Sequence, residues 1–173
     1  MKVKVTPSKV HGNVKIPASK SMAHRALICA SLSDGTSLVS NVTNSKDIEA
    51  TVGCMKALGA IIKQIDETTY EVTGTNLFKQ EGNITCNANE SGSTLRFLIP
   101  LAACTNAKVK FLGQGRLLQR PMDVYENEFK KQNIEFNQSD KEIIVSGNLK
   151  AKDYVVQGDI SSQFITGFMF VLP

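Results

Sequence analysis

The stretch from Pro17 to Leu27, PASKSMAHRAL, places a lysine, two serines and an arginine where a strand-like run gives way to an apolar helical run. The N-terminus of a helix carries unpaired backbone N–H groups and a partial positive charge, so it attracts anions. Lys20 and Arg25 add full charges, and Arg25 shares a helix face with Ser21. A phosphate or carboxylate could satisfy the arginine bidentately. The stretch by itself favours the alternative, an ordinary N-cap with surface charges.

Two later turns follow the same plan. Ser21, Ser91 and Ser161 lie 70 residues apart, and each separates an alternating run from an apolar helical run. If the three segments pack as equivalents, three helix N-termini could converge on one anionic ligand. The neighbouring residues differ between the turns, which favours a shared binding site over a repeat kept only for packing.

Three further arginines could contact an anion. Arg96 lies in an otherwise apolar run, where burial without a partner would be unfavourable, and an internal salt bridge is an equally good interpretation. Arg116 and Arg120 lie in the loop LGQGRLLQRP, where they could bind an anion. The loop contains neither G-K-[ST] nor G-x-G-x-x-G, the glycine patterns of phosphate-binding loops. The two arginines could equally be solvated surface charges.

The sequence shows no arrangement typical of proton chemistry or of a metal site. His24 has no serine, cysteine or carboxylate at a spacing that suggests a triad, and a lone helical histidine is usually structural. The four cysteines are widely separated and include no C-x-x-C pair. We therefore expect neither a zinc site nor a disulfide framework, and thiols that are small core residues in a reducing compartment.

The elements that must position these residues recur along the chain. Runs beginning at Gly12, Gly82 and Asp153 predict strands, each followed by a helix. The pattern predicts an α/β fold in which a β-α-β-α-β-β unit occurs twice and begins a third time, with units at about 12–81, 82–151 and 152–173. The expected elements are helices at 22–32, 45–60, 92–104, 120–133 and 163–173, strands at 36–42 and 107–113, and hairpins at 60–74 and 133–147. Pro121 suits the first turn of its helix, and Gly59 suits a helix end.

Composition sets the broad class. The 173 residues are 42% hydrophobic and 21% charged, which is typical of a folded domain, and the net charge of +4 suits a small anionic ligand as well as nucleic acid. The sequence contains no cluster of basic residues interleaved with aromatic residues, which argues against nucleic-acid binding. The N-terminus lacks a signal-peptide pattern, and no apolar run approaches membrane-spanning length. We expect a cytoplasmic protein.

Four segments together resemble the N-terminal portion of the enolpyruvylshikimate-phosphate synthases, or 3-phosphoshikimate 1-carboxyvinyltransferases. They occur in the order and at the spacing of that family: PASKSMAHRALICASL, NESGSTLRFLIPL, GQGRLLQRPM and GDISSQFITGFMF. The resemblance covers the whole chain. It implies an inside-out α/β barrel of two similar domains, each with three β-α-β-α-β-β units and with the substrates bound between them.

The resemblance also implies a reaction without metal or cofactor. The enolpyruvyl group of phosphoenolpyruvate passes to the 5-hydroxyl of shikimate 3-phosphate and phosphate is released, a step of the shikimate pathway toward chorismate and the aromatic amino acids. The implied site residues comprise shikimate-phosphate ligands, phosphoenolpyruvate ligands and one residue that touches both substrates. The first group is Lys20, Ser21, Arg25, Ser161 and Ser162, the second is Gly92 and Arg120, with Lys20 also reaching phosphoenolpyruvate as the candidate catalytic residue, and Gln163 touches both.

Some features depart from the family pattern. Glu90 stands where many members have a neutral asparagine, and an acid there would be unfavourable unless it pairs with Lys20 or an arginine. The family's acid–base carboxylate and further cationic ligands lie in the other domain, so we expect an incomplete fragment that is inactive alone, from a parent that is a monomer.

Two other functions remain as alternatives. A UDP-N-acetylglucosamine enolpyruvyl transferase shares the repeat, but it usually has Lys-Asn at Lys20-Ser21 and a cysteine in the loop that here reads GQGRLLQRP. A non-catalytic anion-binding module is the second alternative. We expect small-molecule substrates, no nucleic acid and no membrane partner.

Overall fold

Helices and strands alternate along the chain largely as the hydrophobic pattern predicts. The computed structural model describes residues 3–4, 6–9, 11–14 and 16–172. The helices are α1 (Lys20–Leu32), α2 (Lys46–Ala57), α3 (Gly92–Ala102), α4 (Asp123–Lys130) and α5 (Ser162–Met169). The strands are β1 (Thr36–Val39), β2 (Ile61–Gln64), β3 (Tyr70–Thr73), β4 (Glu81–Asn87), β5 (Asn106–Leu112), β6 (Glu135–Gln138) and β7 (Ile143–Ser146).

The strands form two sheets. The first has the order β1-β3-β2 and is antiparallel throughout, and the second has the order β4-β5-β7-β6. In the second sheet β4 and β5 are parallel, as a strand–helix–strand connection through α3 requires, and the remaining pairs are antiparallel. Both expected hairpins are present as β2–β3 and β6–β7. The mixed α/β fold class is confirmed.

Two expected strands are not observed. In the run that begins at Gly12, residue 15 lies outside the described residues, and the described residues around it form no strand. Val14 and Ile16 are 85% and 82% exposed, and Val155, in the run that begins at Asp153, is 87% exposed. Alternating apolar residues show that a segment suits a half-buried strand, but the strand also needs a hydrogen-bonding neighbour. Neither run has one among the described residues.

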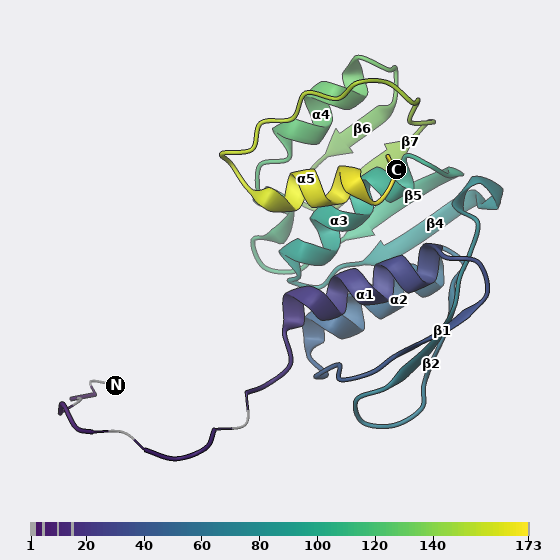
Figure 1. Ribbon diagram of the computed structural model, residues 1–173. Coiled ribbons are helices and arrows are strands. Elements are labelled where there is room, and N and C mark those ends of the chain that lie inside the picture. Colours follow the sequence, from purple (N-terminus) through teal and green to yellow (C-terminus); the bar gives the residue numbers. More distant parts are fainter. Residues whose placement is uncertain (1–2, 5, 10, 15, 173) are drawn as a thin grey trace.

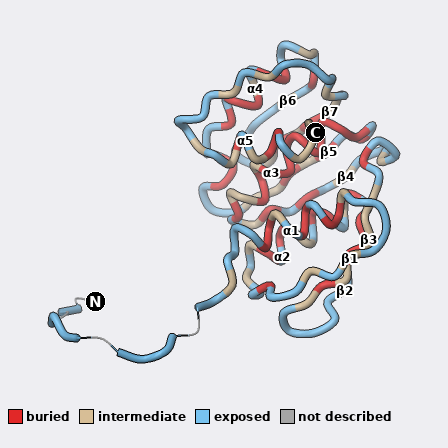
Figure 2. The backbone as a smooth tube through the Cα atoms, viewed as in Figure 1, coloured by how far each residue is buried: buried red, intermediate tan, exposed pale blue. Residues whose placement is uncertain are grey.

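Helix α3 lies at the centre of the molecule. It packs against α1, α2 and α5 and against strands of the second sheet (Figure 1), and all its residues from Phe97 to Ala102 are buried. Figure 2 shows the buried positions concentrated on the facing sides of these elements, while the described residues before α1, apart from the half-buried Ala18, are exposed. The N-terminal ends of α1, α3 and α5 lie on the same side of the molecule, from which this segment leaves (Figure 1).

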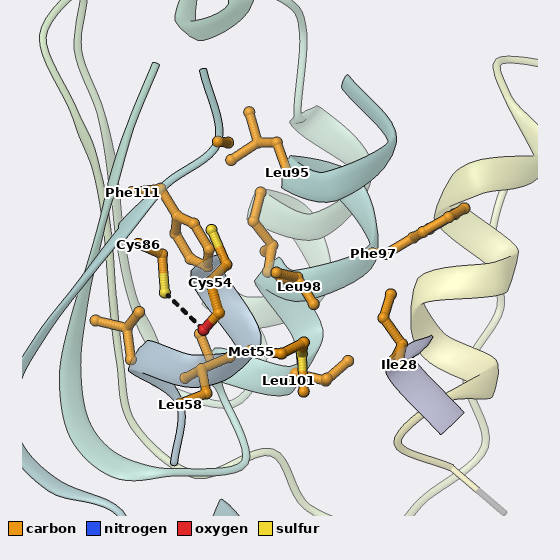
Figure 3. Close-up of a cluster of buried hydrophobic side chains, with 14 of the residues drawn as sticks. Ile28, Cys54, Met55, Leu58, Cys86, Leu95, Phe97, Leu98, Leu101 and Phe111 are labelled. Atoms are coloured by element: carbon orange, nitrogen blue, oxygen red, sulfur yellow. Dashed lines mark hydrogen bonds between the residues drawn. The ribbon is translucent and has the colours of Figure 1, made fainter. Parts of the chain in front are cut away.

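The core joins the two sheets through the helices. Figure 3 shows Leu95, Phe97, Leu98 and Leu101 of α3 among buried side chains of α1, α2, β4 and β5. All four cysteines are free thiols; Cys54, Cys86 and Cys104 are buried, as expected for small core residues, whereas Cys29 is exposed, so that expectation was wrong for it. Because α3 is surrounded by apolar side chains, its N-terminal turn is held at a defined place relative to its neighbours.

The helix boundaries differ from expectation at one proline and agree at one glycine. Helix α4 begins at Asp123 with Met122 as its N-cap, so Pro121 precedes the helix and does not occupy its first turn. Helix α2 ends before Gly59, as predicted. The N–H groups of Gly59 and Ala60 bond back to the carbonyls of Lys56 and Met55, and the positive φ of Gly59 makes this helix end possible.

Candidate anion-binding site at three helix N-termini

Serine side chains cap all three helices, although not at the predicted position in α1. Ser91 accepts a hydrogen bond from the N–H of Thr94 at 3.2 Å, and Ser161 accepts one from the N–H of Gln163 at 3.3 Å. The cap of α1 is Ser19, not Ser21. The helix begins one residue before Ser21, because Ser19 already satisfies the first turn, and Ser21 is left as an exposed residue of that turn.

Helices α3 and α5 are joined by an arginine–glutamine–serine chain. Arg96 donates from Nη1 to Oε1 of Gln163 at 2.9 Å, and Nε2 of Gln163 donates to Oγ of Ser93 at 2.8 Å. The guanidinium group also lies 5.0 Å from the centre of the Phe164 ring. Gln163, in the first turn of α5, therefore contacts two residues at the N-terminal end of α3, and its amide is the partner of Arg96 in place of a carboxylate.

Arg96 is partly buried and lies within the electrostatic influence of Arg120. Burial lowers the pKa of Arg96 below its usual value, and the positive charge of Arg120 lowers it further. Two like charges held near each other repel unless an anion lies between or beside them. Nε of Arg96 is buried and lacks a hydrogen-bond partner among the described residues. These features favour an anionic ligand at this end of α3.

Arg25 bridges α1 and α5. Its Nη1 donates to the carbonyl of Ser21 at 2.9 Å, and its Nη2 donates to Oγ1 of Thr166 at 3.2 Å. The Phe97 ring lies beneath the guanidinium group, 5.0 Å from its central carbon. The side chain is thus positioned by neutral partners, and its charge is not neutralised by them.

Of the predicted cations, only Lys20 has an acidic partner among the residues that the structure describes. Its Nζ lies 2.5 Å from Oδ2 of Asp47, at the start of α2. The lysine side chain is 55% exposed, and an exposed ion pair of this kind contributes only about 0–1 kcal/mol. An incoming phosphate could therefore take Lys20 from Asp47 at little energetic cost.

Gly92 and Arg120 are direct neighbours. A Cβ atom built on Gly92 would collide with Nη1 of Arg120. The loop that contains Arg120 follows β5, and α3 follows β4. Because β4 and β5 are parallel, the loop and the first turn of α3 lie at the same edge of the second sheet.

Among the described residues Glu90 pairs neither with Lys20 nor with an arginine, the two kinds of partner that would make an acid favourable at this position. Lys20 pairs with Asp47, and Glu90 makes no ion pair among the residues that the structure describes. Its Oε1 faces Gly115, where an added Cβ would lie 2.9 Å from the oxygen. The acidic side chain is exposed.

The arginines differ from the lysines in their partners. The chain has four arginines, and every ion pair found among the described residues uses a lysine. The internal salt bridge considered for Arg96 is therefore not observed. Arg116 is exposed in the loop after β5. Arginines without carboxylate partners near three helix N-termini form a surface suited to phosphate and carboxylate groups.

Several residues of this cluster were not predicted. Ser93, Thr166 and Asp47 orient Gln163, Arg25 and Lys20 respectively. Thr166 lies one turn after Ser162, whose carbonyl it contacts at 3.1 Å, so its spacing could have placed it near the predicted serines. Asp47 carried no such signal, because its contact with Lys20 depends on the packing of α2 against α1.

No helix in the described part of the chain is both long enough and apolar enough to cross a bilayer.

Comparison with known proteins points to one family. The family model of EPSP synthase (3-phosphoshikimate 1-carboxyvinyltransferase) matches residues 4–173. The 3-phosphoshikimate 1-carboxyvinyltransferase of Clostridium kluyveri is 47% identical over 173 residues, which cover 99% of this chain and 40% of the relative. The corresponding protein of Clostridioides difficile is 46% identical over 184 residues, covering 99% of this chain and 41% of the relative. The chain thus spans about two fifths of the length of these curated relatives.

A solved structure has the same fold. EPSP synthase from Acinetobacter baumannii superposes with a TM-score of 0.77 over 92% of this chain and 37% of that chain. The two sequences are 19% identical, so the likeness concerns the fold.

Proposed function

Since the chain belongs to the EPSP synthase family, we propose that it forms one part of a 3-phosphoshikimate 1-carboxyvinyltransferase and supplies ligands for both substrates. The enzyme would transfer the enolpyruvyl group of phosphoenolpyruvate to the 5-hydroxyl of shikimate 3-phosphate and release phosphate. The observation that carries this proposal is the group of arginines at the N-terminal ends of α1, α3 and α5 that have no carboxylate partner in the described part of the chain. Two phosphates and a carboxylate are the groups that such a surface would bind.

Shikimate 3-phosphate would lie between α1 and α5. Lys20, Ser21 and Arg25 would bind its phosphate from one side, and Ser161 and Ser162 from the other. The hydrogen bond between Arg25 and Thr166 supports this assignment because it brings the two helices to one place. Lys20 would exchange its exposed contact with Asp47 for the phosphate.

Phosphoenolpyruvate would lie at the first turn of α3. Arg120 lies against Gly92, and Gln163 joins α3 to α5, so Gln163 could touch both substrates. Lys20 would reach phosphoenolpyruvate as the candidate catalytic residue. The same cations would stabilise negative charge as it accumulates on the tetrahedral centre.

The remaining features of the parent protein are part of the proposal. We expect a cytoplasmic monomer that acts on small molecules, and four free thiols fit a reducing compartment. The curated relatives are more than twice as long as this chain. Turnover would therefore require cationic and acid–base groups from the rest of such a protein.

Phosphate release from a chimera tests this function. The chain would replace the matching portion of the Clostridium kluyveri relative, and release would be measured with both substrates, in parallel with the chain alone. We expect turnover by the chimera and none by the chain. A folded chimera without turnover would contradict the proposal, and turnover by the isolated chain would contradict the need for the remaining length.

Two variants of the chimera identify the site. Arg120→Ala removes the cation beside Gly92, whereas Lys141→Ala removes an exposed cation at the tip of the β6–β7 hairpin. Only the first should lower turnover. Equal turnover by the two variants would remove Arg120 from the site.

A further inference from the structure

A chain of buried hydroxyl groups connects α1 to the N-cap of α3. Nδ1 of His24 lies 2.7 Å from Oγ1 of Thr51 in α2, and this oxygen lies 2.7 Å from Oγ1 of Thr94 in α3. Thr94 in turn donates to Oγ of Ser91 at 2.7 Å. The four side chains are at most 2% exposed. The chain crosses three helices within the core, and it ends on the residue that caps the proposed phosphoenolpyruvate turn.

The surroundings of His24 assign its tautomer. Nε2 is buried and has no hydrogen-bond partner among the described residues. A buried N–H without an acceptor is less favourable than a buried lone pair without a donor, because unpaired N–H groups are the rarer exception in proteins. The proton of the neutral ring therefore belongs on Nδ1, where Thr51 accepts it.

This tautomer gives the hydrogen bonds one direction. His24 donates to Thr51, which must then direct its own proton to Thr94, and Thr94 donates to Ser91. The carbonyl of Asp47 is a second acceptor for Thr94, at 3.3 Å. With the opposite tautomer Thr51 would donate to His24 and Thr94 would donate to Thr51, so the bond between Thr94 and Ser91 would persist only if the Ser91 hydroxyl turned to donate to Thr94.

We propose that His24 is a positioning residue, which as its Nδ1–H tautomer holds Thr51, Thr94 and Ser91 in one arrangement and thereby fixes the first turn of α3 beside Arg120. His24 does not need to touch a substrate for this role. Ser91 is the N-cap, and Gly92, which lies against Arg120, is the next residue. A shift of the cap would move the backbone that the proposed function assigns to phosphoenolpyruvate, and this part of the inference rests on that function.

The charged groups around His24 are compatible with a neutral ring. Burial lowers its pKa to about 4, Asp47 opposes this effect, and Lys20 and Arg25 reinforce it. The remaining side of the ring meets the Phe97 ring edge-to-face, with centroids 6.4 Å apart. The ring is therefore neutral at pH 7, where its tautomer is to be measured.

Nuclear magnetic resonance of the 173-residue chain labelled with ¹⁵N-histidine tests the first step. Long-range proton–nitrogen correlations distinguish the two neutral tautomers. At pH 7 we expect His24 as Nδ1–H, and His11, exposed in the N-terminal segment, serves as an internal reference. An Nε2–H tautomer at His24 would overturn the proposal.

Paired substitutions test the second step. His24→Leu and Thr51→Val remove hydrogen-bonding groups with little change of size, while His24→Asn and Thr51→Ser retain a donor or a hydroxyl at the same place. We expect at least tenfold faster hydrogen exchange at the Thr94 amide, which bonds to Ser91, in the first pair and rates near wild type in the second. Exchange that is equal in all four variants would overturn the proposal.

The chimera described above connects the network to the substrate. His24→Leu should raise the KM for phosphoenolpyruvate several-fold more than the KM for shikimate 3-phosphate, and His24→Asn should restore it. Faster Thr94 exchange with an unchanged KM would overturn the link to the substrate turn. A folded wild-type chimera without turnover would contradict the proposed function and the link together, whereas the tautomer and exchange measurements test the network independently.

Discussion

Nη1 of Arg120 occupies the space into which a side chain at position 92 would project. The contact joins two segments 28 residues apart in the sequence, the first residue of α3 and the loop after β5. The need for glycine at position 92 is therefore steric. It does not come from the backbone conformation, because Gly92 is not among the residues of positive φ.

Gly92→Ala should therefore displace Arg120 and leave the protein folded. Alanine suits a helical position better than glycine, by up to about 1 kcal/mol, and the arginine end can move aside. In the chimera we expect the KM for phosphoenolpyruvate to rise by about tenfold to a hundredfold, because a small misplacement of a binding group has effects of that size. Enzyme kinetics and thermal unfolding would check this together. Unchanged kinetics would show that the contact has no role in binding.

Gly167 lies in α5, where it is closely packed, and Gly53 lies in α2, where it serves as the matched control. A Cβ on Gly167 would collide with the hydroxyl of Tyr125 and lie 2.7 Å from the carbonyl of Arg96, whereas a Cβ on Gly53 would meet nothing within 4 Å. We expect Gly167→Ala to lower the free energy of unfolding by about 1–3 kcal/mol. Gly53→Ala should raise it by up to about 1 kcal/mol. Urea unfolding would measure both, and a loss of stability in both variants would refute the steric explanation.

Tyr125 ties α4 to the first turns of α3 and α5. Its buried hydroxyl donates to the carbonyl of Arg96 at 2.6 Å and lies 3.3 Å from the carbonyl of Phe164. Tyr125→Phe should lower the free energy of unfolding by about 1–2 kcal/mol, because it leaves a buried carbonyl without a donor. Chemical denaturation is the measurement. Tyr154→Phe, which removes a partly exposed hydroxyl, is a control that should lose less.

His24 should make stability depend on pH. Its pKa is about 6.5 in an unfolded chain and about 4 in the folded protein, mainly because of burial. Between these values the unfolded chain binds a proton that the folded chain excludes, so stability is complete above pH 6.5 and falls as the pH decreases toward 4. At pH 4.5 the wild type should have lost about 2 kcal/mol more than His24→Asn, relative to pH 7.5. Parallel pH profiles of the two proteins would contradict this assignment.

Much of the fold could be predicted from the periodicity of hydrophobic residues and from the turn residues. The helices, both hairpins and the end of α2 at Gly59 depend on interactions between residues near one another in sequence. The strands expected after Gly12 and Asp153 were wrong because pairing depends on a neighbouring strand, which a local pattern does not report. The cap of α1 is Ser19 and not Ser21. Both serines are suitable N-cap residues near the start of the helix, and the sequence alone does not distinguish between them.

The site residues that lie in sequence motifs could be predicted, whereas those that reach the site only through the packing of helices could not. The signature segments identified Lys20, Arg25, Gly92, Arg120 and Gln163, and their ligand roles stay predictions. The partners that orient these side chains, such as Thr166 for Arg25, come from other helices and depend on how those helices pack. The network from His24 to Ser91 could not be anticipated for the same reason, since its members lie on three helices.

The most direct test of the proposed site is calorimetric titration of shikimate 3-phosphate into the chimera. Arg25 is held by the Ser21 carbonyl and the Thr166 hydroxyl and has no carboxylate partner among the described residues, so a phosphate would be its first ionic partner. Hydrogen bonds to charged groups contribute about 1.5–3 kcal/mol, so Arg25→Ala should weaken binding by about tenfold to a hundredfold, while Lys141→Ala should leave it unchanged. Equal affinities for the wild type and Arg25→Ala would contradict the claim that these helix ends bind the substrate phosphate.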